Sequence, residues 1–183
     1  MPDVMRNTTL LRHTPAVFRE LLQPLDDELL HVNEGPGTWS PYQVLAHVTW
    51  GELDDWIPRA RIVLEHGEAL PFRPFDRLGG EKRFAGWELG ALLDEFARLR
   101  AENLETLESM RLRPLDLRRT GRHPTLGIVS LSQLLACWVT HDLAHITQIA
   151  RVLVRAQAPH IGPWREFFSV LKEQGEQGEA RAG

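Results

Sequence analysis

Cysteine is nearly absent from this chain. Cys137 is the single cysteine among 183 residues, so an internal disulfide is excluded and a reducing cytoplasm is the expected location. Long apolar runs are missing too, since none approaches the roughly 18–20 residues that a membrane span requires. The N-terminus lacks a charged start followed by an apolar stretch, and we therefore expect no signal peptide.

The chain also lacks a net positive charge. The formal net charge is −4 and the isoelectric point is near 6.1. Nucleic acids and anionic membranes are bound by basic protein surfaces, so neither is expected as a partner. A small-molecule substrate fits this composition better.

Strand signals and internal repeats are nearly lacking as well. The segment Leu-Gly-Ile-Val at 126–129 is too short to predict a strand, and no linker divides the chain. We predict one helical domain over residues 1–175. The polar, glycine-rich tail at 176–183 is expected to be disordered.

Apolar residues recur at helical spacing along most of the chain. Thr14-Pro15 and Ser40-Pro41 both have the form of an N-cap followed by a first-turn proline, and Ser130 is a third candidate N-cap. Pro58 should bend or split the second helix. The predicted helices are 15–32, 41–66, 87–110 and 131–157, followed by a short fifth helix from 161. This pattern predicts an all-α protein, a four-helix bundle with a short C-terminal helix.

The last long helix carries His141 and His145 four residues apart in "ACWVTHDLAHITQIARVLV". Chance alone gives about 0.3 such pairs among eight histidines in 183 residues, so the spacing by itself is weak. Both imidazoles fall on the apolar face of the helix and should point into the bundle. They are either core histidines with hydrogen-bond partners or two ligands of one metal ion.

A metal site needs at least one further ligand, and His47 is the best candidate. It lies on or beside the apolar face of the second predicted helix, whereas the other five histidines fall near helix ends or in turns. Glu52, Asp54 and Asp55 are expected on a solvated face of the same helix. Cys137, one turn before His141, is expected to be a small buried core residue and not a ligand.

The segments "TWSPYQVLAHVTW" and "HDLAHITQIARV" together resemble the DinB/YfiT-like superfamily. The resemblance covers about residues 10–157, and "GPWREFF" suits the short closing helix of such proteins. It implies a four-helix bundle that holds a divalent metal through three histidines, here His47, His141 and His145. Zinc and nickel suit imidazole ligands best.

Four other side chains are candidates for the surroundings of this site. Gln148 either points into the pocket or caps the edge of the core. Asp142 either accepts an N–H from a neighbouring helix or, as such residues more often do, faces solvent. Trp50 and Trp138 either wall an apolar pocket or belong to the core. The sequence assigns no catalytic residue.

Three functions remain open at this point. The resemblance favours a metal-dependent thiol S-transferase related to the bacillithiol and mycothiol enzymes, with a low-molecular-weight thiol as cofactor. Arginines would then hold its carboxylates, and the sequence offers Arg59, Arg61, Arg118, Arg119 and Arg122. The alternatives are a metal-dependent hydrolase and a non-enzymatic, stress-related bundle in which metal fastens two helices. Homodimers are compatible with each.

Overall fold

Two serine capping boxes start the helices that carry the candidate histidines. Ser40 precedes α3 (Pro41–Asp54) and Ser130 precedes α7 (Leu131–Gln157). Each serine side chain accepts the backbone N–H three residues later, and the glutamine at that position accepts the serine N–H in return. Both predicted N-caps are confirmed, and α7 has the predicted bounds.

The second predicted helix is split, as the proline within it indicated. α3 ends at Asp54 and α4 (Trp56–Glu65) follows directly, with Pro58 in its first turn. Proline lacks the N–H that would continue the helix, so the break falls just before it. α6 (Leu89–Ser109) lies within the third predicted range.

The first helix departs from its prediction. α1 (Val4–Leu22) contains Pro15 in its interior, so the assignment of Thr14 as an N-cap is wrong. A proline at this place leaves the carbonyl of Leu11 without its helical donor. Nη1 of Arg100, from α6, donates to that carbonyl at 2.8 Å, which compensates for the missing bond. The helix can therefore continue through the proline.

Short elements complete the chain between residues 4 and 172, which the computed structural model describes. A hairpin pairs β1 (Thr120–His123) with β2 (Gly127–Ser130), so the expectation that 126–129 forms no strand is wrong. The closing helix is a 3-10 helix in two pieces. The remaining short elements are α2 (Asp27–His31), α5 (Gly79–Arg83) and the 3-10 turns at Asp116–Arg118, Gly162–Phe167 and Ser169–Leu171. The tail predicted at 176–183 lies outside the described residues.

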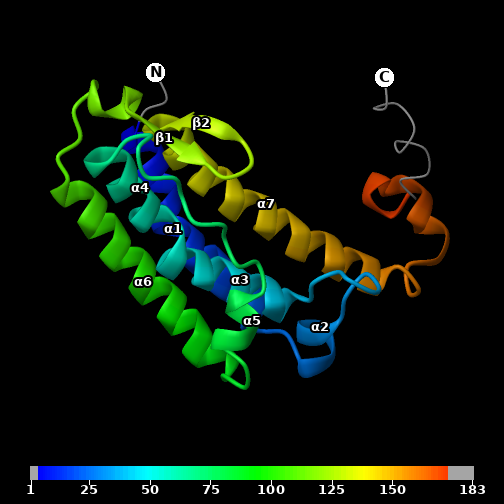
Figure 1. Cartoon of the computed structure of the whole chain (residues 1–183). Helices are drawn as coiled ribbons and strands as arrows, with labels where there is room; N and C mark the ends of the chain where they lie inside the picture. The colour runs from blue at the N-terminus through cyan, green and yellow to red at the C-terminus, as the bar shows by residue number, and fades with distance from the viewer. Residues whose placement is uncertain (1–3, 173–183) are drawn as a thin grey trace.

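The long helices pack as a four-helix bundle, with α3 and α4 forming one broken member (Figure 1). The hairpin lies beside the start of α7, and α2 and α5 lie toward the opposite end of the bundle (Figure 1). The all-α class and the bundle with a short C-terminal helix are confirmed. No helix within residues 4–172 is both long and apolar enough to cross a membrane.

The buried apolar side chains form two clusters, one toward each end of the bundle. Leu11, Trp56, Leu104 and Trp138 belong to the first cluster. Phe18, Val48, Phe96 and Ile149 belong to the second cluster. On each long helix a buried polar residue lies between the two sets, so a polar layer crosses the middle of the bundle. These residues are Thr14, Glu52, Arg100 and Asp142. 

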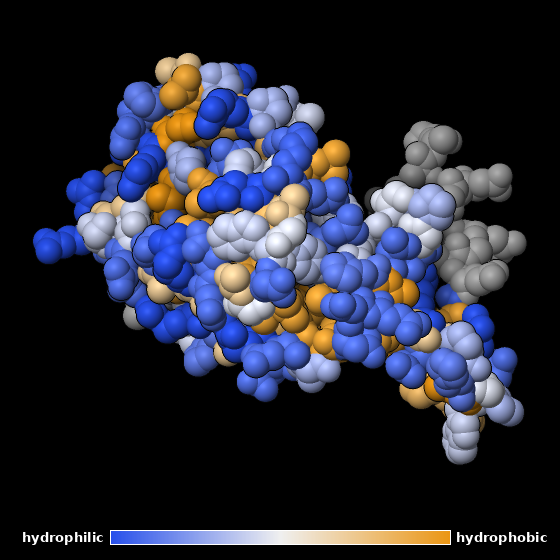
Figure 2. Space-filling view, turned by 90° about the horizontal axis from the view of Figure 1, so that it is seen from below, coloured by the Kyte–Doolittle hydropathy of each residue, from blue (hydrophilic) through white to orange (hydrophobic). Residues whose placement is uncertain are grey.

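The surface is mainly polar on the face that Figure 2 shows, where apolar side chains appear as small patches between charged ones. The most exposed large apolar side chains after α7 are Trp164 and Phe167, at 68% and 77%.

Candidate metal centre

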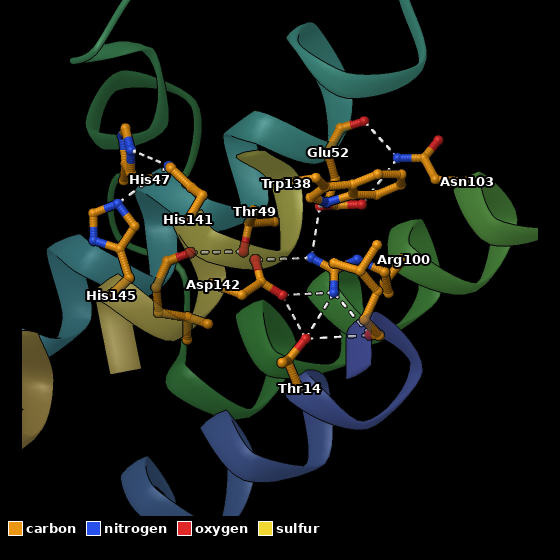
Figure 3. A network of polar contacts seen from close by, with 12 residues as sticks. Thr14, His47, Thr49, Glu52, Arg100, Asn103, Trp138, His141, Asp142 and His145 are labelled. Atoms are coloured by element: carbon orange, nitrogen blue, oxygen red, sulfur yellow. Dashed lines mark hydrogen bonds and ion pairs between the residues drawn. The ribbon is translucent and has the colours of Figure 1, made fainter. Parts of the chain in front are cut away.

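The three predicted histidines meet between α3 and α7. Nε2 of His141 lies 3.1 Å from Nε2 of His47 and 3.1 Å from Nε2 of His145 (Figure 3). One ring nitrogen from each residue lies within 4.8 Å of the others. The i, i+4 spacing stacks the two α7 imidazoles on one face, and α3 brings the third opposite them.

This spacing suits a single metal ion. Two nitrogens bound at about 2.05 Å from one ion lie about 2.9 Å apart at a right angle and about 3.3 Å apart at the tetrahedral angle. The two measured separations fall between these values. Because three ring nitrogens face one another with no carboxylate in the group, the donor set is that of a borderline-soft divalent cation.

The protonation of the imidazoles fits the same role. Burial, and after it the neighbouring His145, lowers the pKa of His47 to about 4. Burial, followed by the other two histidines, lowers the pKa of His141 to about 2. Burial also lowers the pKa of His145. All three rings are therefore neutral near pH 7, and neutral imidazole is the form that binds metal.

Gln148 contacts the centre directly. Its Oε1 lies 2.9 Å from Nδ1 of His145, so Nδ1 donates and Nε2 is left with its lone pair toward the other two histidines. Gln148 is absent from the cavity lining, so it contacts a histidine of the group but does not point into the cavity, as one of its two interpretations had it. Nδ1 of His47 and Nδ1 of His141 are buried and have no hydrogen-bond partner among the described residues.

Asp142 is buried, and the expectation that it faces solvent is wrong. Its Oδ2 accepts hydrogen bonds from Thr14 Oγ1 and from Nη1 of Arg100, the latter at 2.7 Å (Figure 3). The alternative, that Asp142 accepts from a neighbouring helix, is the arrangement found. The aspartate follows His141 directly in α7 and anchors the ligand-bearing helix from behind.

Glu52 and Asp55 are also buried, so the solvated face expected for "GELDDW" is wrong for both. Oε1 of Glu52 accepts from Nη2 of Arg100 at 2.8 Å and from Nε1 of Trp138 at 2.9 Å (Figure 3). Nδ2 of Asn103 donates to Oε2 of Glu52 at 3.0 Å. A buried carboxylate is stable only with such partners.

A cavity of about 710 Å³ opens beside the three histidines, and apolar side chains make up most of its wall. Trp50 and Trp138 are absent from its lining, and Trp138 stacks on Trp56 within the core at 5.8 Å between ring centroids. Trp56, and not Trp138, is the tryptophan on the cavity wall beside the histidines. Its ring centroid lies 5.2 Å from that of His141. The other aromatic rings of the wall are Phe72, Phe75 and His123.

Charged groups line the cavity at two places. Nε of Arg59 lies 2.6 Å from Oδ1 of Asp55, and burial raises the pKa of this aspartate to about 6 although Arg59 opposes the shift. Arg77 also lines the cavity; its guanidinium lies 5.5 Å from the ring centroid of Trp39 and has no carboxylate partner among residues 4–172. Its charge helps to lower the pKa values of His47 and His145.

Cys137 lines the same cavity with an exposed side chain, so the expectation of burial is wrong. It stands outside the three-histidine group. Of the five arginines that the sequence offered, Arg59 alone lies on the cavity wall.

Several wall residues could not be predicted from the sequence, because Phe72, Phe75 and Arg77 come from the stretch between the predicted helices 41–66 and 87–110. The burial of Arg100 does have a signal in the sequence. Arg100 falls four residues after Phe96 and four before Leu104, inside the apolar stripe of α6. A charged residue at such a position is buried only when it is paired.

Three comparisons with known proteins bear on the family and the fold of this chain. The family model of the DinB superfamily matches residues 10–149. A candidate metal-dependent hydrolase from Oceanobacillus iheyensis is 25% identical over 143 residues, which cover 75% of this chain and 80% of that protein.

A solved structure shares the fold. It is YfiT from Bacillus subtilis, described as a probable metal-dependent hydrolase with an unusual four-helix bundle topology. The TM-score is 0.73 at 22% sequence identity, and the match covers 84% of this chain and 87% of that one.

Proposed function

The chain belongs to the DinB superfamily, and we propose that it is a divalent-metal enzyme that acts on a small molecule through His47, His141 and His145. One observation carries the proposal: the three ring nitrogens converge on the wall of a 710 Å³ cavity. A purely structural site is closed by its protein ligands, whereas a catalytic site keeps a position open to substrate. A three-ligand group that faces a cavity matches the second arrangement.

Zinc or nickel fits the nitrogen-only donor set best. When bound, the ion supplies Lewis acidity, which lowers the pKa of a thiol or a water at its open positions. The chain's own part is to keep the three imidazoles neutral by burial and to fix the His145 tautomer through Gln148.

The cavity wall indicates what is bound. Trp56, Phe72 and Phe75 supply apolar surface that excludes water and packs against a substrate. The Asp55–Arg59 pair cancels its own charge, whereas Arg77 has no carboxylate partner among the described residues. Arg77 therefore favours a substrate or cofactor with a negative group near the metal.

Thiol S-transfer is the reaction we place first. The thiol proton passes to solvent, the sulfur attacks an electrophilic carbon to form a C–S bond, and the leaving group departs with its electron pair. This attack needs no general base once the thiol has ionised. The absence of any carboxylate from the three-histidine group of the described residues is compatible with that requirement.

Hydrolysis is the second candidate, and two observations favour it. The Oceanobacillus relative is described as a candidate metal-dependent hydrolase and YfiT as a probable one. Asp55 lines the cavity and its pKa, raised by burial to about 6, is suited to a general base near neutral pH. Water would then attack an ester or amide carbonyl while the aspartate takes its proton. The C–O or C–N bond would break, and the alcohol or amine would leave with the electron pair and take up that proton.

The two reactions are separated by one set of assays. Purified protein is analysed for metal, and the metal-loaded form is given a chromogenic electrophile with several low-molecular-weight thiols, or a p-nitrophenyl ester without thiol. S-transfer predicts turnover only with thiol, and hydrolysis predicts ester turnover without it. His141→Ala should abolish either activity, and His66→Ala, which alters an exposed histidine, should not. No turnover on either panel, with unfolding by a chelator, would favour a structural metal instead.

A further inference from the structure

Arg100 joins the two helices that carry the histidines. It is 1% exposed, on α6. Its Nη2 donates to Glu52 of α3 at 2.8 Å and to Oδ1 of Asp142 of α7 at 3.1 Å, while its Nη1 donates to Oδ2 of Asp142 at 2.7 Å (Figure 3). The contact with Asp142 is thus bidentate, which fixes direction as well as distance.

Both carboxylates are close to metal ligands along their own helices. Glu52 follows His47 by five residues in α3, and Asp142 lies between His141 and His145 in α7. Because a helix is nearly rigid along its axis, residues one turn apart move by the same amount when the helix slides. A guanidinium that sets the separation of the two carboxylates therefore also sets the separation of the imidazoles.

Arg100 is itself held from the opposite side. Nη1 donates to the carbonyl of Leu11 at 2.8 Å and to Oγ1 of Thr14 at 2.7 Å, both in α1. The Leu11 carbonyl is available because Pro15 cannot donate to it. The guanidinium also lies 5.0 Å from the ring centroid of Phe96 and 5.2 Å from that of Trp138. It therefore cannot follow either carboxylate if one helix slides.

The charges of this network also favour a cation. Two buried carboxylates face one guanidinium, which leaves one negative charge uncompensated behind the histidines. A divalent cation held by the three histidines adds charge of the opposite sign. Coulombic attraction in a buried setting is stronger than in water.

We propose that Arg100 is a positioning residue for the three-histidine centre: through Glu52 and Asp142 it fixes the register of α3 against α7 and so pre-sets the imidazoles for one ion. The proposal rests on the metal site of the proposed function. A residue that only stabilises the bundle would lower the stability of the fold and leave the affinity of the folded protein for metal unchanged.

The test measures Co²⁺ binding to the full chain, by chelator competition and by the visible ligand-field spectrum. The variants are Arg100→Lys, which keeps the charge but loses the fork, and Glu52→Gln, which keeps the shape but loses the charge. Leu107→Ala is the matched control, a buried apolar truncation on the same helix and outside the network. Urea midpoints establish that each variant is folded under the binding conditions.

We expect both network variants to bind Co²⁺ about 10–100-fold more weakly than the wild type, with a changed spectrum, as is usual when groups behind metal ligands are altered. Leu107→Ala should lower the urea midpoint but keep the wild-type affinity and spectrum. If the Arg100→Lys variant does not fold, the Co²⁺ affinity of Glu52→Gln tests the positioning role. Wild-type binding by the folded network variants would overturn the positioning role alone, whereas wild-type protein that takes up no Co²⁺ would overturn the proposed metal site.

Discussion

Gln148 shows how one side chain sets the chemistry of a neighbour. Because Oε1 accepts from Nδ1 of His145 at 2.9 Å, the ring presents its lone pair on Nε2. Gln148→Leu removes the acceptor at similar volume, and we expect the affinity for Zn²⁺ to fall about 10–100-fold. Competition with a chromogenic chelator measures it. Thr147→Ala, on the exposed side of the same turn, is the control and should bind as the wild type does.

Acid should destabilise the metal-free protein through the same histidines. Their folded pKa values lie below the unfolded value of about 6.5, at about 4 for His47 and about 2 for His141. The unfolded chain therefore binds more protons, and the free energy of unfolding falls as the pH drops from 6.5 toward 4, by up to about 1.4 kcal/mol per pH unit for each ring. Above pH 6.5 these groups contribute no slope.

Asp55 has the opposite effect on the pH dependence of stability. Because its pKa is raised, the folded state binds more protons at this group than the unfolded state does between its ordinary pKa and about pH 6. Three imidazoles outweigh one carboxyl, so the net slope keeps its sign. Urea midpoints in the presence of a chelator, taken from pH 7 to pH 4, measure it. His141→Gln should flatten the curve; an unchanged slope in this variant would contradict the assignment.

At the scale of elements, α5 docks on α3 through glycine. A Cβ at Gly80 would stand 2.4 Å from the carbonyl oxygen of Ala46 and 3.0 Å from the backbone nitrogen of His47. Gly80→Ala must push the helices apart, and we expect it to cost about 1–3 kcal/mol of stability. Because the contact is at His47, metal affinity should fall as well.

Gly90→Ala is the matched control for this prediction. Nothing lies within 4 Å of a Cβ at Gly90, in the first turn of α6. Alanine has the higher helix propensity, so the substitution should be neutral or stabilise by up to about 1 kcal/mol. Urea denaturation followed by circular dichroism compares the two. Equal stability of Gly80→Ala and Gly90→Ala would show that α5 can move away freely.

Two prolines show where local rules succeed and where they fail. Pro58 breaks the second helix as proline chemistry predicts, since α4 begins just before it. Pro15 has the form of a first-turn residue after Thr14 but lies inside α1. Two donors replace the N–H that Pro15 lacks at the Leu11 carbonyl: Oγ1 of Thr14 at 3.2 Å and Nη1 of Arg100 at 2.8 Å. That arginine is 89 residues away along the chain, so no local pattern reveals it.

For the whole molecule, metal should stabilise a fold that exists without it. Two apolar clusters and the Arg100 network already join the four long helices. We expect chelated protein to remain helical at 25 °C. Zn²⁺ at about 100 times its Kd should add about 2.7 kcal/mol, and so raise Tm by roughly 5–10 °C. Circular dichroism melts with and without chelator measure this effect.

His141→Ala should melt at the same temperature with and without Zn²⁺, because the central ligand is gone. His66→Ala, at an exposed position, should keep the full shift. Complete unfolding of the wild type by the chelator would instead mean that the ion holds the bundle together, and the structural alternative would then stand.

The sequence by itself determined the helices from residue 41 to residue 157 that carry or flank the histidines, and it singled out the three histidines. Capping boxes, helical periodicity and proline are signals between residues a few positions apart, so the bounds of α7 and the break before Pro58 could be predicted. The three histidines were found because each lies on an apolar face and a known family shares their order.

Only the tertiary structure decided what surrounds them. Asp142 is held by Thr14, 128 residues away, and by Arg100, 42 residues away. The cavity wall combines residues of α3, α4, α7, the hairpin and the loop before α5. A buried charge costs free energy until its partners are in place. Those partners come from other helices, so the burial of Asp142, Glu52 and Arg100 follows from how the bundle packs and not from the segments that contain them.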